Sequence, residues 1–205
     1  MNFTNALKLI RLRSFLMYKI TKKYPSATQA IIGLDKKIII NLCLNLSKNK
    51  IVSPIAFNSN NQTIVSGDKK LVKKIVFLCK KLGAKRTINL NINIPLHSLH
   101  MKKISTKMFL ALKKITFNVP TFPIINNVDV KCEFSSKNIK DALIRQLYNP
   151  VRWDEIMKLI ISYKIKNIIE IGPGKILSNI NQEFKEIQSI SLYKNKNFFS
   201  NIGNK

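Results

Sequence analysis

Residues 62–83, "QTIVSGDKKLVKKIVFLCKKLG", have the pattern of a strand followed by a helix. Residues 62–67 contain β-branched side chains and predict the strand. Asp68 stands where a helix N-cap is expected, because its carboxylate can accept hydrogen bonds from the first free N–H groups of the helix. Gly83 stands where the helix should end, since glycine readily adopts the left-handed conformation of a C-terminal cap. The stretch therefore predicts a strand–helix unit with both helix ends defined.

The neighbouring residues extend this unit into a longer pattern. Before it, we expect a strand over 29–34, a helix over 35–48 with Asp35 as its N-cap, and a strand over 51–57 that turns back through "NSNN". After it, residues 85–92 predict a closing strand. The order βαββαβ is the ferredoxin-like pattern, and it covers about residues 24–93.

RNA-recognition motifs share this element order, so nucleic-acid binding has to be considered. Those modules stack bases on aromatic residues of a strand that carries K/R-G-F/Y-G/A-F-V-x-F/Y. The expected strands contain one Phe and no such signature. We therefore do not expect nucleic-acid binding through this sheet. A basic ferredoxin-like module that binds RNA or an acidic protein is kept as the alternative function.

The composition limits the class of protein. A chain of 205 residues with 45% apolar residues can bury a core, in one domain or in one domain with an inserted lobe. No apolar run approaches the roughly 18 residues of a membrane helix. The cysteines (Cys43, Cys79 and Cys132) are odd in number and widely spaced, which suits buried thiols in a reducing compartment. We expect a cytoplasmic protein.

The chain is strongly basic, with 36 Lys and Arg against 10 Asp and Glu and a net charge of +26. One interpretation is binding to a polyanion. The other is mutational bias, because Lys, Ile and Asn, whose codons are A/T-rich, occur throughout the chain. On either interpretation the surface favours an acidic partner.

Outside residues 24–93 the pattern is mainly helical. The basic amphipathic stretch 6–20 predicts a helix, although such a start is also typical of a transit peptide. Further helices are expected over 98–115, 138–150 and 151–165, with a loop and strand over 121–130. Residues 167–180, "NIIEIGPGKILSNI", predict a strand, a turn at Gly172 and Gly174, and a helix, and residues 193–205 form a tail.

Both histidines lie in "NINIPLHSLH", residues 91–100. A metal site needs three or four ligands, and His97 and His100 supply two with no carboxylate motif nearby. We expect no metal. His97 follows a proline at the expected end of a strand, where a side chain can be presented into a cleft. His100 is assigned a structural role.

Several blocks resemble one known family in the same order: "QAIIGL", "VSPIAFNSNNQTIVSG", "GAKR", "IPLHSLHMK", "KITFNVPTFPIINNVDVKCE", "IRQLYNPVRW" and "EIGPGKIL". Together they resemble bacterial malonyl-CoA:acyl carrier protein transacylase, from near Met1 to about Leu192. The resemblance implies an α/β fold: an α/β-hydrolase-like acyltransferase domain, here N-terminally incomplete, formed by residues 1–23 and 94–192. The ferredoxin-like subdomain, residues 24–93, is inserted in it.

The resemblance also implies roles for individual residues. His97 matches the histidine that acts as general base toward a serine. Arg13 matches the arginine that binds the free carboxylate of the malonyl group through two parallel hydrogen bonds. Gln146 matches a position that helps to hold the histidine, as the Asp does in a Ser-His-Asp triad. Asn58 matches a polar position near the family's cleft.

One family feature is missing from the sequence. The nucleophile is the Ser of a G-H-S-x-G elbow, and no G-x-S-x-G occurs in the 205 residues. We expect the elbow to be encoded upstream of Met1, and the chain alone to be inactive. A gene model begun too late, a split enzyme and a decayed gene are the three explanations that the sequence leaves open.

The function implied by the resemblance is an S-malonyltransferase of fatty-acid biosynthesis, which moves malonyl from CoA to the carrier-protein thiol by a Ser-His mechanism. The implied partners are malonyl-CoA, an acidic acyl carrier protein and an N-terminal fragment that carries the nucleophile. No cofactor of the enzyme itself is expected, since phosphopantetheine belongs to the carrier protein.

Overall fold

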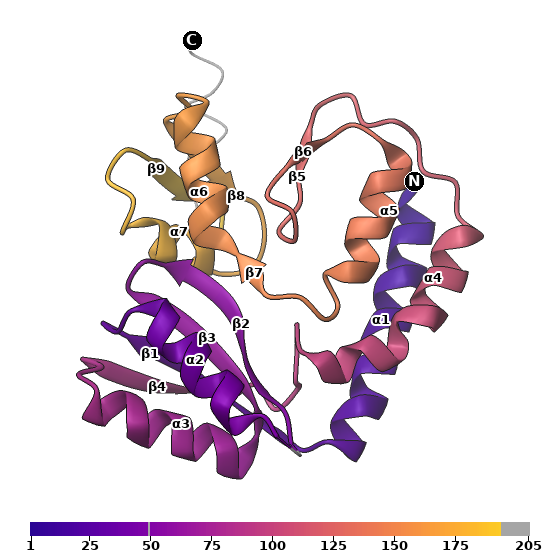
Figure 1. The fold of residues 1–205 in the computed structure, drawn as a ribbon. Helices are drawn as coiled ribbons and strands as arrows, with labels where there is room; N and C mark the ends of the chain where they lie inside the picture. Colours follow the sequence, from indigo (N-terminus) through magenta and orange to yellow (C-terminus); the bar gives the residue numbers. More distant parts are fainter. Residues whose placement is uncertain (49, 194–205) are drawn as a thin grey trace. The chain divides into compact units, whose positions relative to one another are not determined.

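The computed structural model describes residues 1–48 and 50–193, and the chain divides into two compact units, Met1–Asp154 and Glu155–Lys205. The first unit contains a five-stranded sheet and a group of helices (Figure 1). Most of the expected tail, from residue 194 on, lies outside the described residues.

The sheet has the strand order β4-β1-β3-β2-β7. The pairs β1–β3, β1–β4 and β2–β3 are antiparallel, while β7 adds two residues in parallel to β2. The element order from β1 to β4 is βαββαβ, as the sequence predicts. The elements are β1 (Ser26–Ile32), α2 (Lys36–Leu46), β2 (Val52–Ser59), β3 (Gln62–Asp68), α3 (Lys69–Lys81), β4 (Arg86–Leu90) and β7 (Val151–Arg152).

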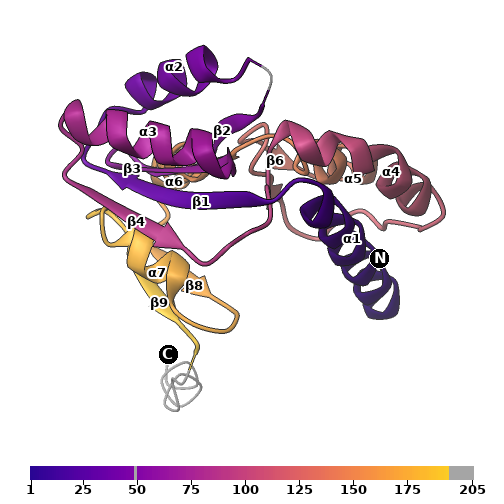
Figure 2. The same ribbon diagram turned by 90° about the horizontal axis from the view of Figure 1, so that it is seen from below.

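Both helices of this pattern cover the same face of the sheet (Figure 2). The predicted caps are confirmed: Asp35 accepts from the N–H of Lys37, and Asp68 accepts from two N–H groups of α3. The core between helices and sheet is formed by Ile31, Leu34, Ile39, Cys43, Val52, Val65, Val72, Ile75 and Cys79. A smaller apolar cluster on the other face contains Ala30, Ile55 and Ile64, with Leu96 packed against it.

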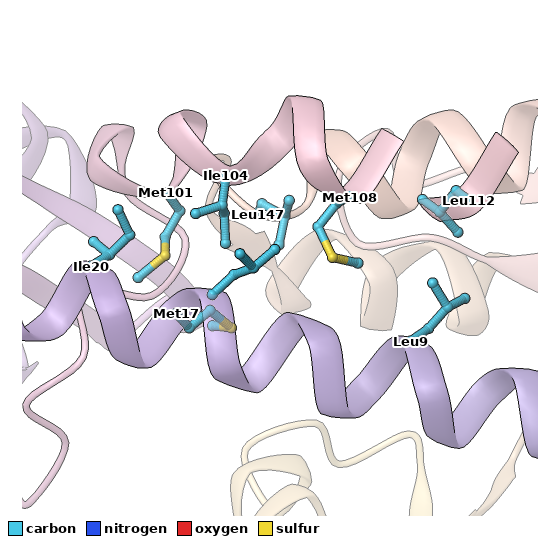
Figure 3. Packing of buried hydrophobic residues seen from close by; sticks show 9 residues of the cluster. Leu9, Met17, Ile20, Met101, Ile104, Met108, Leu112 and Leu147 are labelled. Atoms are coloured by element: carbon cyan, nitrogen blue, oxygen red, sulfur yellow. The ribbon is translucent and has the colours of Figure 1, made fainter. Parts of the chain in front are cut away.

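The helical part of the first unit has its own core. Its elements are α1 (Phe3–Lys23), the 3-10 helix η1 (Leu99–Ile104), α4 (Ser105–Lys113), the hairpin β5 (Ile124–Ile125) and β6 (Cys132–Glu133), and α5 (Ser136–Arg145). Figure 3 shows the apolar side chains of α1 facing those of η1 and α4. The buried residues are Leu9, Leu16, Met17, Ile20, Met101, Ile104, Met108, Leu112 and Leu147.

Three sequence-based expectations need correction here. The helix expected over 98–115 begins as a 3-10 helix and becomes α-helical at Ser105. The strand before His97 ends at Leu90, so His97 lies in a turn and not at a strand end. The helix expected to end at Pro150 ends at Arg145 with Gln146 as its C-cap.

The second unit is small. The helix α6 (Trp153–Ser162) leads into it, and β8 (Asn167–Glu170), α7 (Ile176–Asn181) and β9 (Gln188–Ser191) follow. β8 and β9 form a two-stranded parallel sheet, and the side chain of Glu170 accepts hydrogen bonds from the N–H groups of Leu177 and Ser178. The strand and helix predicted on either side of Gly172 and Gly174 are confirmed, whereas β9 is an element that the sequence did not reveal.

Candidate active site

The turn after β4 holds His97 in an uncommon conformation. Its φ is +51°, in the left-handed region that few residues other than glycine adopt. Ser98, which follows it, is buried and donates a 2.6 Å hydrogen bond to the carbonyl of Pro95, and its own carbonyl accepts from Met101 N at the start of η1. The hydroxyl of Ser98 is therefore committed to the turn, and hydrogen bonds within the turn support the strained conformation.

The imidazole of His97 is held by main-chain groups. Its Nδ1 lies 2.7 Å from the carbonyl oxygen of Gln146. A carbonyl oxygen can only accept, so Nδ1 carries the proton and Nε2 keeps its lone pair. Burial lowers the pKa of His97 and the charge of Arg13 lowers it further, against the opposite effect of main-chain hydrogen bonds to Gln146 and Asn149. Burial therefore favours the neutral imidazole, with Nε2 as its basic nitrogen.

Arg13 is a half-buried residue of α1, and its positive charge lowers the pKa of His97. Its Nε is buried without a hydrogen-bond partner, and Arg13 forms no ion pair with any residue that the structure describes. Burial lowers the pKa of this guanidinium. A partly buried cation without a counterion, with one N–H buried and unsatisfied, favours an anionic ligand at this position. Arg11, two residues away, is exposed.

Gln146 contacts His97 through its main chain, and its side chain is directed to another residue. Its Nε2 donates to Oδ1 of Asn127 at 3.0 Å, while its main-chain carbonyl holds the histidine. The side chain therefore fixes the position of the peptide carbonyl through the β5–β6 hairpin. Gln146 thus contacts the histidine, as expected for this position, and the accepting atom belongs to the main chain.

Side-chain hydrogen bonds from two arginines stabilise the hairpin that contains Asn127. Arg145, the residue before Gln146, donates two hydrogen bonds to the carboxylate of Asp129, at 2.6 and 2.7 Å, and a third to Asp141. Arg152 donates from its side chain to the carbonyl of Val128 at 2.9 Å. Sequence reasoning did not identify these bracing residues, although "NNVDV" and "IRQLYNPVRW" stood among the family-like blocks.

The remaining expectations concern Asn58, His100 and metals. Asn58 lies in the β2–β3 hairpin and its side chain is 3.5 Å from that of Gln62, with no contact to His97. His100 stacks on Tyr24 with ring centroids 4.5 Å apart. Within the described part of the chain, no group of three or more His, Cys, Asp or Glu side chains could hold a metal ion, and no helix is long and apolar enough to cross a membrane.

Comparison with known proteins settles the family. The profile described as "Acyl transferase domain" matches residues 2–195. The chain belongs to this family. It is 50% identical over 196 residues to the malonyl CoA-acyl carrier protein transacylase of Buchnera aphidicola subsp. Schizaphis graminum, covering 96% of this chain and 63% of the relative. The Escherichia coli K12 protein of the same name is 38% identical, with 93% and 62% covered.

Solved structures of this acyl transferase type superpose on the chain. A malonyl-transacylase in complex with a type II PKS acyl-carrier protein matches with a TM-score of 0.93 at 36% identity, covering 100% of this chain and 67% of that one. An acyl carrier protein S-malonyltransferase from Vibrio cholerae gives 0.88 at 38% identity, with 94% and 63% covered. The chain spans less than two thirds of the length of the curated relatives described above.

Proposed function

We propose that this chain supplies the base and the carboxylate-binding residue of a malonyl-CoA:acyl carrier protein S-malonyltransferase. The observation that carries the proposal is the pairing of His97 and Arg13. Burial favours the neutral form of His97, whose Nδ1–H is held by the Gln146 carbonyl, while Arg13 is a half-buried cation with a buried, unpartnered Nε, and its charge lowers the pKa of His97. A base for a hydroxyl or thiol beside a site for a carboxylate suits a malonyl thioester.

The proposed chemistry has two transfers. Nε2 of His97 accepts the proton of a serine hydroxyl while the serine oxygen attacks the thioester carbon. The C–S bond breaks, and CoA leaves as its thiol with that proton. The carrier-protein thiol then gives a proton to His97 and attacks the malonyl–serine ester, and the serine oxygen recovers the proton. Arg13 holds the malonyl carboxylate during both steps.

We propose that the serine comes from a segment other than these 205 residues, because they contain no G-x-S-x-G. Exposed apolar side chains support a covering segment. On α1, Phe3, Leu7 and Ile10 lie at helical spacing and are 78%, 50% and 60% exposed. In the second unit Ile171, just after β8, is 83% exposed. Large apolar faces of this kind mark interaction surfaces.

The proposed function also implies an assignment of the fold. We propose that β1 to β4 with α2 and α3 form a ferredoxin-like subdomain inserted in an α/β-hydrolase-like acyltransferase domain. The strand order β4-β1-β3-β2 and the matches to solved malonyl-transacylases support this.

An acidic acyl carrier protein is the proposed second substrate. Its support is the net charge of +26 and the similar solved structure of a malonyl-transacylase in complex with an acyl-carrier protein. RNA binding by the sheet is not favoured. The single Phe of strands β1 to β4, Phe57, is buried and therefore offers no stacking surface for a base.

The test is a complementation experiment. Purified chain is mixed with malonyl-CoA, alone and with the N-terminal segment of a full-length relative, and malonyl adducts are measured by intact-mass spectrometry. We expect no adduct on the chain alone and one malonyl group on the elbow serine in the mixture, absent with His97→Ala. A stoichiometric adduct on a serine of the isolated chain, or complementation that survives His97→Ala, contradicts the proposal.

A further inference from the structure

A cavity lies in the first unit, and the residues assigned to acyl transfer do not line it. Its volume is about 470 Å³. It is formed by the end of α1, the start of β1, the residues before β2, the end of β3, and η1. None of His97, Arg13 and Gln146 lines it. Its lining is Lys23, Tyr24, Pro25, Ser26, Lys50, Ile51, Gly67, Asp68, His100 and Lys103.

The charges around this cavity are not balanced. Three ammonium groups come from separate segments, and Asp68 is the single carboxylate of the lining. Asp68 is already occupied: its Oδ1 accepts from the N–H groups of Lys70 and Leu71, and its Oδ2 accepts from Lys50 at 3.0 Å. Lys23 and Lys103 have no carboxylate partner among the described residues. The lining therefore carries excess positive charge.

These two lysines converge on one aromatic ring. Their Nζ atoms lie 5.9 and 4.3 Å from the ring centroid of Tyr24, and Lys103 also donates a hydrogen bond to the Tyr24 hydroxyl. Cation–π contacts hold ammonium groups in place without neutralising them. An anion in the cavity would be attracted by both ammonium groups.

His100 adds a neutral hydrogen-bond donor. Its ring stacks on Tyr24, and its Nδ1 is buried without a partner. A proton on Nδ1 would be an unsatisfied buried N–H, so the ring is best accommodated neutral with its proton on Nε2. Because Nδ1 is the buried nitrogen, Nε2 is the one that can face the cavity. This explains a histidine that the acyl-transfer chemistry does not use.

We infer that this cavity binds the phosphate group of a small molecule. Phosphate oxygens match the donors present, namely the ammonium groups of Lys23 and Lys103, the Nε2–H of His100, and the N–H groups of the Lys50 ammonium that are not directed to Asp68. Lysine binds phosphate as a point charge, which suits cations brought together from several segments. The volume lies in the range of small-molecule pockets, roughly 300–1,000 Å³, so it accommodates a phosphate together with the group attached to it. The inference is independent of the proposed acyl transfer.

The test is isothermal titration calorimetry on the full 205-residue chain with three probes at constant ionic strength: inorganic phosphate, inorganic pyrophosphate and ADP. One saturable site is expected. Tighter binding of ADP than of phosphate identifies a phosphorylated metabolite as the ligand class, while equal binding identifies the free anion. Absence of a saturable site for all three probes overturns the inference.

A charge-matched comparison separates this site from the general basicity of the chain. The variant Lys23→Gln/Lys50→Gln/Lys103→Gln should weaken binding at least tenfold. The control Lys73→Gln/Lys74→Gln/Lys80→Gln changes the net charge equally at exposed positions of α3 and should stay within twofold of the wild type. Equal losses in both variants overturn the inference. Should the site variant fail to fold by circular dichroism, the single variants Lys23→Gln and His100→Ala replace it, each with an expected loss of threefold or more.

Discussion

Nδ1 of His97 lies 2.7 Å from the main-chain carbonyl of Gln146, 49 residues further along the chain. This hydrogen bond fixes the tautomer of the base with an atom that no side-chain substitution removes. The side chain of Gln146 acts one step further away, by joining its peptide to Asn127. The main-chain oxygen of Gln146 therefore orients His97, whereas its side-chain Nε2 only positions the peptide.

Gln146→Ala should leave the Nδ1–H tautomer of His97 in place, since the accepting carbonyl is still present. Nitrogen NMR of the labelled imidazole measures the tautomer directly. In a complemented enzyme we expect a loss in kcat of less than tenfold. His97→Ala should cost about 10²–10⁴-fold, the usual contribution of a general base. A loss of the same size in both variants would show that the amide side chain itself is required.

The brace between Arg145 and Asp129 should stabilise the hairpin beside the histidine. The two side chains are 31% and 28% exposed and bonded through two parallel contacts, whereas Asp141, the other partner of Arg145, is 60% exposed. Asp129→Asn should lower the free energy of unfolding by about 1 kcal/mol, and Asp141→Asn by about 0.3 kcal/mol. Urea unfolding followed by circular dichroism measures both. The reverse order of the two losses would contradict this account.

The stability of the chain should fall as the pH drops below about 6.5. Burial is the first cause that lowers the pKa of both His97 and His100 from the ordinary value of 6.5. A histidine with a lowered pKa in the folded state binds fewer protons there than in the unfolded chain, so stability is complete above pH 6.5 and is lost toward the folded-state pKa. Thermal unfolding between pH 7.5 and 5.5 measures the slope. In the double variant His97→Gln/His100→Gln, stability should depend less on pH over this range. An unchanged slope would show that other groups cause the pH dependence.

The parts of the fold that the sequence predicted are those with local signals. Asp35 and Asp68 cap helices through N–H groups two or three residues away, so their roles are visible in a short window. The left-handed φ of His97 is different, because it is held by contacts with residues far along the chain. The ion pair between Arg145 and Asp129 joins residues 16 positions apart, and the helix predicted over residues 138–150 gives no indication of it. The candidate site residues came from family resemblance, since a lone arginine such as Arg13 has no distinctive spacing.

The proposed role of Arg13 in binding the malonyl carboxylate predicts a change in acyl-group selectivity. In a complemented enzyme, Arg13→Ala should cost on the order of 2–4 kcal/mol of transition-state binding for malonyl-CoA, because a bidentate contact to the carboxylate is lost. Acetyl-CoA has no such carboxylate, so the preference for malonyl over acetyl should narrow. Arg11→Ala, at an exposed position two residues away, is the matched control and should leave the preference unchanged. An equal fall of kcat/KM for both substrates in Arg13→Ala would argue against the carboxylate contact.

Hydrogen exchange should divide the isolated chain into slow and fast regions. Strands β1 to β4 have antiparallel partners and a buried core beneath α2 and α3, so their amides should exchange slowly. β8 and β9 form a two-stranded parallel sheet, and such sheets are normally buried between further strands and helices. Ile169 in β8 and Ile171 just after it are exposed, which leaves their face of this sheet without an apolar cover. We therefore expect residues 167–191 to exchange at least 100-fold faster than residues 26–68, and to slow down when the N-terminal segment of a relative is added.

Mass spectrometry of peptides from both regions measures the difference in exchange rate. The α3 peptide is the internal control, since the added segment should not change its exchange. Equally slow exchange in both regions of the isolated chain would mean that the β8–β9 sheet is stable without a covering segment.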